Sequence, residues 1–111
     1  NQYNPRVKAG VAYYGLLSGL TSDIKPQDPI DIAAKLSVPT LGLYAGNDSF
    51  ISDALVDQMR AELQKSGSGS DIVVFPGLNH GFNADYRPTY DKAAADYAWK
   101  LASDWFKERG V

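Results

Sequence analysis

One histidine and one aspartate stand where parallel α/β proteins carry their catalytic side chains. His80 is the single histidine of the chain and follows the apolar run "VVFPGLN", between Gly77 and Gly81. Asp48 follows a second apolar run, "LGLYAGN". Functional groups in such proteins gather just beyond the carboxyl ends of the strands. A carboxylate that accepts the ring N–H of a histidine fixes the tautomer and stabilises the imidazolium formed during catalysis. The two positions therefore predict an Asp–His pair that acts as a general base.

Three apolar runs predict the strands that must position this pair. They extend over Val7 to Gly15, Val38 to Asp48 and Asp71 to Gly77, and each is bounded by Gly, Pro or Asp turn signals. Their apolar character is nearly continuous, which is typical of strands covered on both faces in a parallel sheet.

Helical patterns lie between and after these runs. From Ser52 to Ser66 apolar residues recur on one face, with Ser52 as the N-cap and Gly67 as the stop. A short helix is expected over Asp28 to Leu36. A long helix is expected from about Pro88 to Arg109, with Pro88 at a first helical position and one apolar stripe made of Tyr90, Ala94, Tyr97, Leu101 and Trp105.

This order of elements predicts an α/β fold with about three parallel strands, flanking helices and right-handed crossovers. Consecutive parallel strands usually adjoin, so Asp48 and His80 are expected to meet above the sheet. On the residues alone, a structural role is equally open, because aspartate commonly forms turns and loop histidines commonly have no catalytic task.

Composition narrows the classes of partner. The formal net charge is −2 with a pI near 5.2, and Lys and Arg are scattered along the chain. We therefore expect neither a nucleic-acid partner nor a polybasic membrane contact. No apolar run reaches the roughly 18 residues of a membrane span. The chain has no cysteine, which agrees with a cytoplasmic location and leaves little for a zinc site.

Four stretches carry a family resemblance: "VAYYG", "PTLGLYAGNDSFIS", "VVFPGLNHGF" and "RPTYDKAAADYAWKLASDWF". Together they resemble the C-terminal half of the dienelactone hydrolase (carboxymethylenebutenolidase) family of α/β-hydrolases. The resemblance implies hydrolysis of esters and lactones by a Cys–His–Asp or Ser–His–Asp triad, without a cofactor. It implies that His80 is the general base, that Asp48 orients it, and that Tyr14 and Phe50 line the substrate pocket.

Two further residues of the pattern are expected to act locally. Phe82 would pack in the interior, and Arg87 would form a pair or a cap near the last helix. One departure from the family is larger than these details. The chain has no cysteine, no serine has glycines two residues away on both sides, and Ser18 in "GLLSGL" has the wrong spacing for a nucleophile.

We therefore expect residues 1–111 to be a partial α/β-hydrolase domain that lacks its N-terminal half. Such a chain would be inactive or nearly so alone, because the nucleophile and the oxyanion hole lie elsewhere. Its expected partners are a small ester or lactone in the complete enzyme, and either the N-terminal segment or a second copy of the chain. The alternative is a non-catalytic, self-associating α/β remnant or interaction module, which the same residues would also form.

Overall fold

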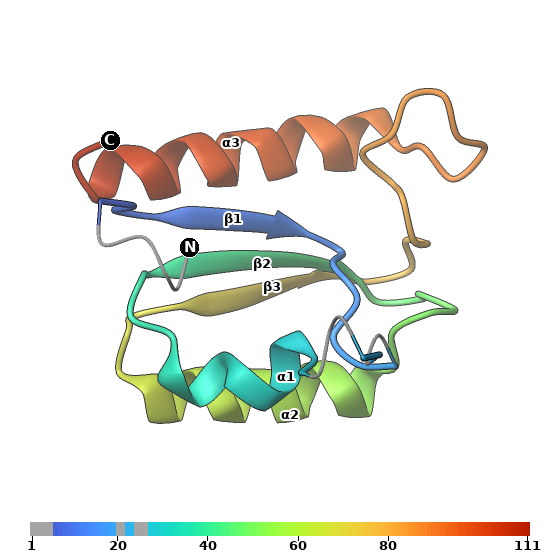
Figure 1. Ribbon diagram of the computed structural model, residues 1–111. Helices are drawn as coiled ribbons and strands as arrows, with labels where there is room; N and C mark the ends of the chain where they lie inside the picture. Colours follow the sequence, from blue (N-terminus) through green and yellow to red (C-terminus); the bar gives the residue numbers. More distant parts are fainter. Residues whose placement is uncertain (1–5, 20–21, 24–26) are drawn as a thin grey trace.

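A three-stranded parallel sheet lies between two layers of helices (Figure 1). The computed structural model describes residues 6–19, 22–23 and 27–111. The strands follow one another in the order β1-β2-β3, which are Gly10–Tyr13, Thr40–Ala45 and Asp71–Phe75. On one face lie α1 and α2, which are Pro29–Ile32 and Asp53–Ser66, and on the other lies α3, Lys92–Glu108. The predicted α/β class with three parallel strands is confirmed.

The central strand β2 divides its side chains between the two faces. Leu43 pairs with Tyr13 of β1 and Val73 of β3, and it is completely buried. Because successive side chains of a strand point to opposite faces, Leu43 lies toward α3 and Tyr44 toward α1 and α2. Both faces are covered, which explains why the strands read as continuous apolar runs.

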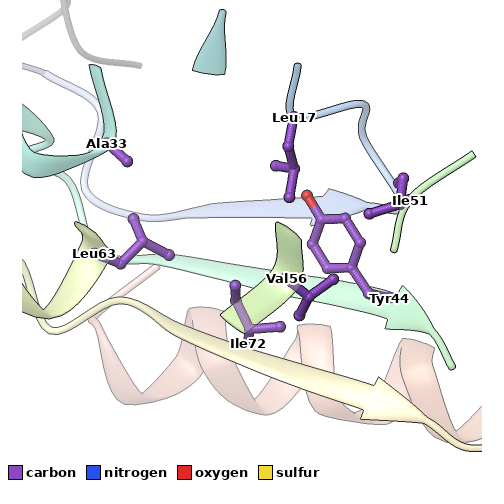
Figure 2. Packing of buried hydrophobic residues seen from close by; sticks show 7 residues of the cluster. All are labelled: Leu17, Ala33, Tyr44, Ile51, Val56, Leu63 and Ile72. Carbon is purple, nitrogen blue, oxygen red and sulfur yellow. The ribbon is translucent and has the colours of Figure 1, made fainter. Parts of the chain in front are cut away.

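Each face has its own hydrophobic cluster. The cluster on the α1–α2 face includes the Tyr44 ring and is shown in Figure 2; its buried members are Leu17, Ala33, Tyr44, Ile51, Val56, Leu63 and Ile72. The cluster on the α3 face includes the ring of Phe82; its buried members are Leu41, Leu43, Ala45, Phe75, Phe82 and Ala98. Two members of this second cluster, Ala45 and Phe75, are the last residues of β2 and β3, from which the loops of Asp48 and His80 continue.

The helix α2 begins and ends where the sequence predicts. The Ser52 side chain accepts a hydrogen bond from the Leu55 N–H at 3.2 Å, and Gly67 closes the helix in the left-handed conformation with φ 65°. Ahead of it, the predicted short helix is present as α1, which continues into a 3₁₀ turn over Ala33–Lys35.

The long helix begins later than the sequence indicates. It starts at Lys92, with Asp91 as the N-cap, whose carboxylate accepts from the Ala94 N–H at 2.9 Å. The prediction of a start at Pro88 is wrong, because Pro88 and Tyr90 lie in the turns before the helix. Of the predicted stripe, Ala94, Leu101 and Trp105 do pack against the cluster on the sheet face, but the most deeply buried residues of the helix are Ala95, Ala98 and Ala102.

None of the helices in the described part of the chain is both long and apolar enough to cross a membrane.

Candidate active site

Asp48 and His80 meet at the carboxyl edge of the sheet, as predicted. Asp48 lies in the loop after β2 and His80 in the loop after β3, and Asp48 Oδ2 is 2.6 Å from His80 Nδ1. A carboxylate can only accept, so Nδ1 carries the proton and donates it. In the neutral imidazole the other ring nitrogen, Nε2, then carries no proton and can accept one from a nucleophile.

The carboxylate of Asp48 is held from its own loop as well. Its side chain is 0% exposed, and its Oδ1 accepts the backbone N–H of Phe50 at 2.7 Å and of Ile51 at 3.2 Å. One carboxylate oxygen is therefore committed to the backbone and the other to the histidine. This arrangement fixes the aspartate in the orientation that a histidine-orienting acid requires.

The loops that carry the pair are bonded to each other. The Gly46 N–H donates to the Phe75 carbonyl at 2.8 Å and the Asn47 N–H to the Leu78 carbonyl at 2.9 Å. The side chain of the same Asn47 reaches the next residue of the histidine loop, where its Nδ2 donates to Asn79 Oδ1 at 2.9 Å. We did not predict this amide pair from the sequence. The sequence feature that could have revealed it is that an asparagine directly precedes both Asp48 and His80.

Two aromatic rings contact the imidazole of His80. The Tyr14 and Phe50 ring centres each lie 5.0 Å from the imidazole centre, with interplanar angles of 57° and 65°. The structure thus brings both residues of the expected substrate pocket to the histidine itself. The Phe50 residue is 68% exposed, whereas the His80 side chain is 19% exposed. Part of the imidazole and most of Phe50 therefore face the space above the sheet edge.

Tyr14 reaches the histidine through an unusual backbone conformation. Its φ is 34°, and it is the one non-glycine residue with positive φ in the described part of the chain. In an extended strand its side chain would point away from that of Tyr13, toward the α1–α2 face. It instead packs at 5.5 Å on Phe82, in the cluster on the α3 face. Such backbone strain is common at functional sites.

The Tyr14 hydroxyl has a defined environment. Burial raises the pKa of Tyr14 above its ordinary value, and the nearby Arg87 guanidinium partly opposes this shift. The Asn83 backbone likewise acts to lower the pKa of this hydroxyl. The turn after β1 is held from the opposite face, where the Tyr44 hydroxyl donates to the Gly15 carbonyl at 3.0 Å.

The residues after the histidine act locally. Phe82 is 0% exposed, which confirms its packing role. Gly81 has φ 84°, a conformation that favours glycine, and a Cβ at this position would lie 2.9 Å from Arg87 Cδ, so the Arg87 side chain would also have to shift. Arg87 therefore lies along the histidine loop. The cap of α3 is formed by Asp91 instead.

A parallel sheet with an acid and then a histidine at successive strand ends is the arrangement of the α/β-hydrolase class. The chain matches the model of the dienelactone hydrolase family over residues 1–110. It is 47% identical over 109 residues to a "Putative carboxymethylenebutenolidase" of Methylorubrum extorquens, covering 98% of this chain and 38% of that protein. The protein of the same name from Escherichia coli K12 is 44% identical over 108 residues, covering 97% of this chain and 40% of that protein. The chain therefore belongs to the dienelactone hydrolase family, which is a family of hydrolases.

Solved structures agree with this assignment. A "Putative Dienelactone Hydrolase" from Klebsiella pneumoniae is similar with a TM-score of 0.90 and 41% identity, covering 96% of this chain and 45% of that one. Esterase 2 of Thermogutta terrifontis has a TM-score of 0.71 at 19% identity, covering 93% of this chain and 40% of that one, and it shares the fold. The chain thus spans about two fifths of the length of the curated relatives named above.

Proposed function

We propose that the chain supplies the aspartate and the histidine of a nucleophile–His–Asp triad in an ester or lactone hydrolase. The observation that carries this proposal is the 2.6 Å bond between Asp48 Oδ2 and His80 Nδ1 at the carboxyl edge of the sheet. Membership of the dienelactone hydrolase family supports the reaction class. In this proposal residues 1–111 are a partial domain, and the nucleophile and oxyanion hole lie in a segment that precedes them.

The pair would act on a nucleophile, a cysteine or serine, from that segment. Nε2 of His80 takes the proton of the nucleophile as it attacks the carbonyl carbon of the ester or lactone. The tetrahedral oxyanion then collapses, the bond from carbon to the leaving oxygen breaks, and His80 returns the proton to that oxygen. Water repeats the sequence on the acyl-enzyme and releases the acid. Asp48 stabilises the imidazolium in both halves, and Tyr14 and Phe50 border the substrate beside the imidazole.

Without the nucleophile, the 111-residue chain would have little or no activity, because the pair alone stabilises no oxyanion. Its partners would be a small ester or lactone and either the preceding segment or a second copy of the chain, at the outer edge of β1. We also predict that the protein is cytoplasmic, needs no cofactor, and has no nucleic-acid or membrane partner.

The test compares two proteins: residues 1–111 alone, and the same residues with the coding sequence that precedes them. Hydrolysis of a p-nitrophenyl ester and of an enol lactone is followed for both. We expect activity in the longer protein only, lost on His80→Ala, with a nucleophile in that segment labelled by an active-site-directed reagent. A clear rate from the short chain that His80→Ala abolishes would overturn the proposal.

One observation favours a second candidate, a non-catalytic self-associating module. The sheet ends at β1, so the outer edge of that strand has no neighbouring strand in the described part of the chain. If the preceding sequence contains no nucleophile and the chain forms stable dimers through β1, the module is the better description.

A further inference from the structure

We infer that Asn47 and Asn79 are positioning residues that hold the loops of Asp48 and His80 in the register their hydrogen bond needs. The inference rests on the proposed function, since it assigns a role to the amide pair in that same site. It starts from one contact outside the acid–histidine pair, the 2.9 Å bond from Asn47 Nδ2 to Asn79 Oδ1.

The amide pair has a particular place in the series of bonds between the two loops. Two backbone bonds join the loops at their bases, from Gly46 N to Phe75 O and from Asn47 N to Leu78 O. Beyond them, in the described residues, the Asn47–Asn79 bond is the last link before the Asp48–His80 bond. Each asparagine directly precedes one member of the pair. The hydrogen bond between the two asparagine side chains therefore limits how far Asp48 and His80 can move apart.

The two members of the pair need this link unequally. Asp48 is fixed by its own loop, because the N–H groups of Phe50 and Ile51 both donate to its Oδ1. The described contacts of the His80 side chain are its bond to Asp48 and the rings of Tyr14 and Phe50. Ring contacts are weakly directional compared with a hydrogen bond. The link through Asn79 therefore acts chiefly on the histidine loop.

The fold does not depend on the amide pair. Asn47 and Asn79 are exposed and belong to neither hydrophobic cluster. Neither has a positive φ, so alanine at these positions introduces no backbone strain. A neutral amide pair also adds no net charge beside the Asp48–His80 pair. These features separate a positioning role from a folding role and make the inference testable by substitution.

Loss of the Asn47–Asn79 hydrogen bond should lower the catalytic rate. The 2.6 Å bond is short, as charge-assisted hydrogen bonds are, and its strength falls steeply with misalignment. Catalytic groups must be held near their productive geometry, and small displacements lower the rate of the chemical step. The expected effect is therefore on kcat, whereas substrate binding is little changed.

The experiment uses the longer enzyme and three variants: Asn47→Ala, Asn79→Ala and the double variant. We expect each single variant to lower kcat about tenfold with KM nearly unchanged, and the double variant to be no worse than either single one. In proton NMR the Nδ1–H resonance of His80, assigned by its disappearance in His80→Gln, should broaden or vanish in all three. Asn79→Asp keeps a side-chain oxygen for Asn47 Nδ2 and should restore the resonance. Gln58→Ala, an exposed amide on α2, is the matched control and should change neither readout.

The outcomes separate this inference from the proposed function. An unchanged Nδ1–H resonance in Asn79→Ala, additive losses in the double variant, or an unchanged kcat each overturns the positioning role. If the wild-type enzyme lacks the resonance, or if the resonance persists in His80→Gln, the acid–histidine pair itself is overturned, and the proposed function with it.

Discussion

Hydrogen bonds join the loops that follow β2 and β3, whereas the outer edge of β1 has no neighbouring strand among the described residues. Between β2 and β3, the loops are joined by backbone and side-chain bonds, and both oxygens of Asp48 are used. At β1 the outer edge of the strand has no described neighbour, and the Tyr13 hydroxyl is buried without a hydrogen-bond partner in the described residues. We call these the closed side and the open side.

The helix α3 repeats the same contrast on its two flanks. Ala98 faces the sheet and is fully buried, and residues one step away on a helix lie about 100° to either side of it. Tyr97 contacts the Phe75 ring of β3 at 6.1 Å, so it marks the closed flank. Trp99 then lies on the opposite flank, toward β1, and is 68% exposed. The comparison teaches that the acid–histidine pair is complete within the described chain, whereas under the proposed function the remainder of the catalytic site would be added at the open side.

The largest effect is expected at the closed side, from Asp48→Asn in the longer enzyme. The amide keeps an oxygen for the Phe50 N–H but presents an N–H to His80, so the histidine is no longer held in the tautomer that accepts a proton. We expect kcat/KM to fall by about 10³- to 10⁴-fold. Asp53→Asn, in the exposed first turn of α2, is the matched control. A loss of less than tenfold would remove Asp48 from the triad.

Below the pair, Phe82→Ala tests whether the closed side rests on the α3-face cluster. Phe82 is fully buried, so the substitution removes packing and leaves a cavity. We expect the free energy of unfolding in urea to fall by about 3–5 kcal/mol. Phe50→Ala removes a ring of the same kind that is mostly exposed, and should cost under about 1 kcal/mol. Equal losses of unfolding free energy in the two variants would show that the buried ring of Phe82 supports the closed side no more than the exposed ring of Phe50 does.

Between the two sides, Tyr44 predicts a pH dependence. Burial raises the pKa of Tyr44 to about 12, and the Asp48 carboxylate adds to the shift. A raised pKa in the folded state means that this stabilisation is complete below the unfolded pKa of 10.0 and is lost as the pH rises toward 12. The loss is about 2–3 kcal/mol, and Tyr44→Phe should flatten this part of the stability curve. If stability falls equally steeply with pH in Tyr44→Phe, the pH dependence comes from other tyrosines, such as Tyr13 and Tyr14. Burial also raises the pKa values of these two residues.

The smallest effect is expected at the open side, from Trp99→Lys in the 111-residue chain. Because Trp99 is exposed, stability should change by less than about 0.5 kcal/mol. If the open side mediates self-association, sedimentation should show the dimer dissociation constant rising roughly tenfold. Tyr97→Lys, on the closed flank and 55% exposed, is the control. Equal weakening by both variants would mean that association does not follow the open side.

The boundaries of α2 and the approximate place of each strand could be predicted because the signals are local. Ser52 and Gly67 satisfy the ends of their own helix, and the apolar runs reflect burial on both faces. The start of α3 could not be placed, because an apolar period continues through Pro88 and Tyr90 although the backbone there forms turns. Asp91 decides the start by capping Ala94 while its own N–H donates to the Phe82 carbonyl at 3.0 Å.

By itself, the sequence determined the alternating elements and the placement of Asp48 and His80 after successive strands. Parallel strands share one carboxyl edge, so residue order alone was enough to bring that pair together. Only the tertiary structure decided that Tyr14 turns toward the histidine, with φ 34°, and that Asn47 bonds to Asn79. Both depend on how side chains from separate loops meet in space. The hydrophobic periodicity of a single segment indicates which of its residues are buried, but it does not specify which residues of other segments they contact.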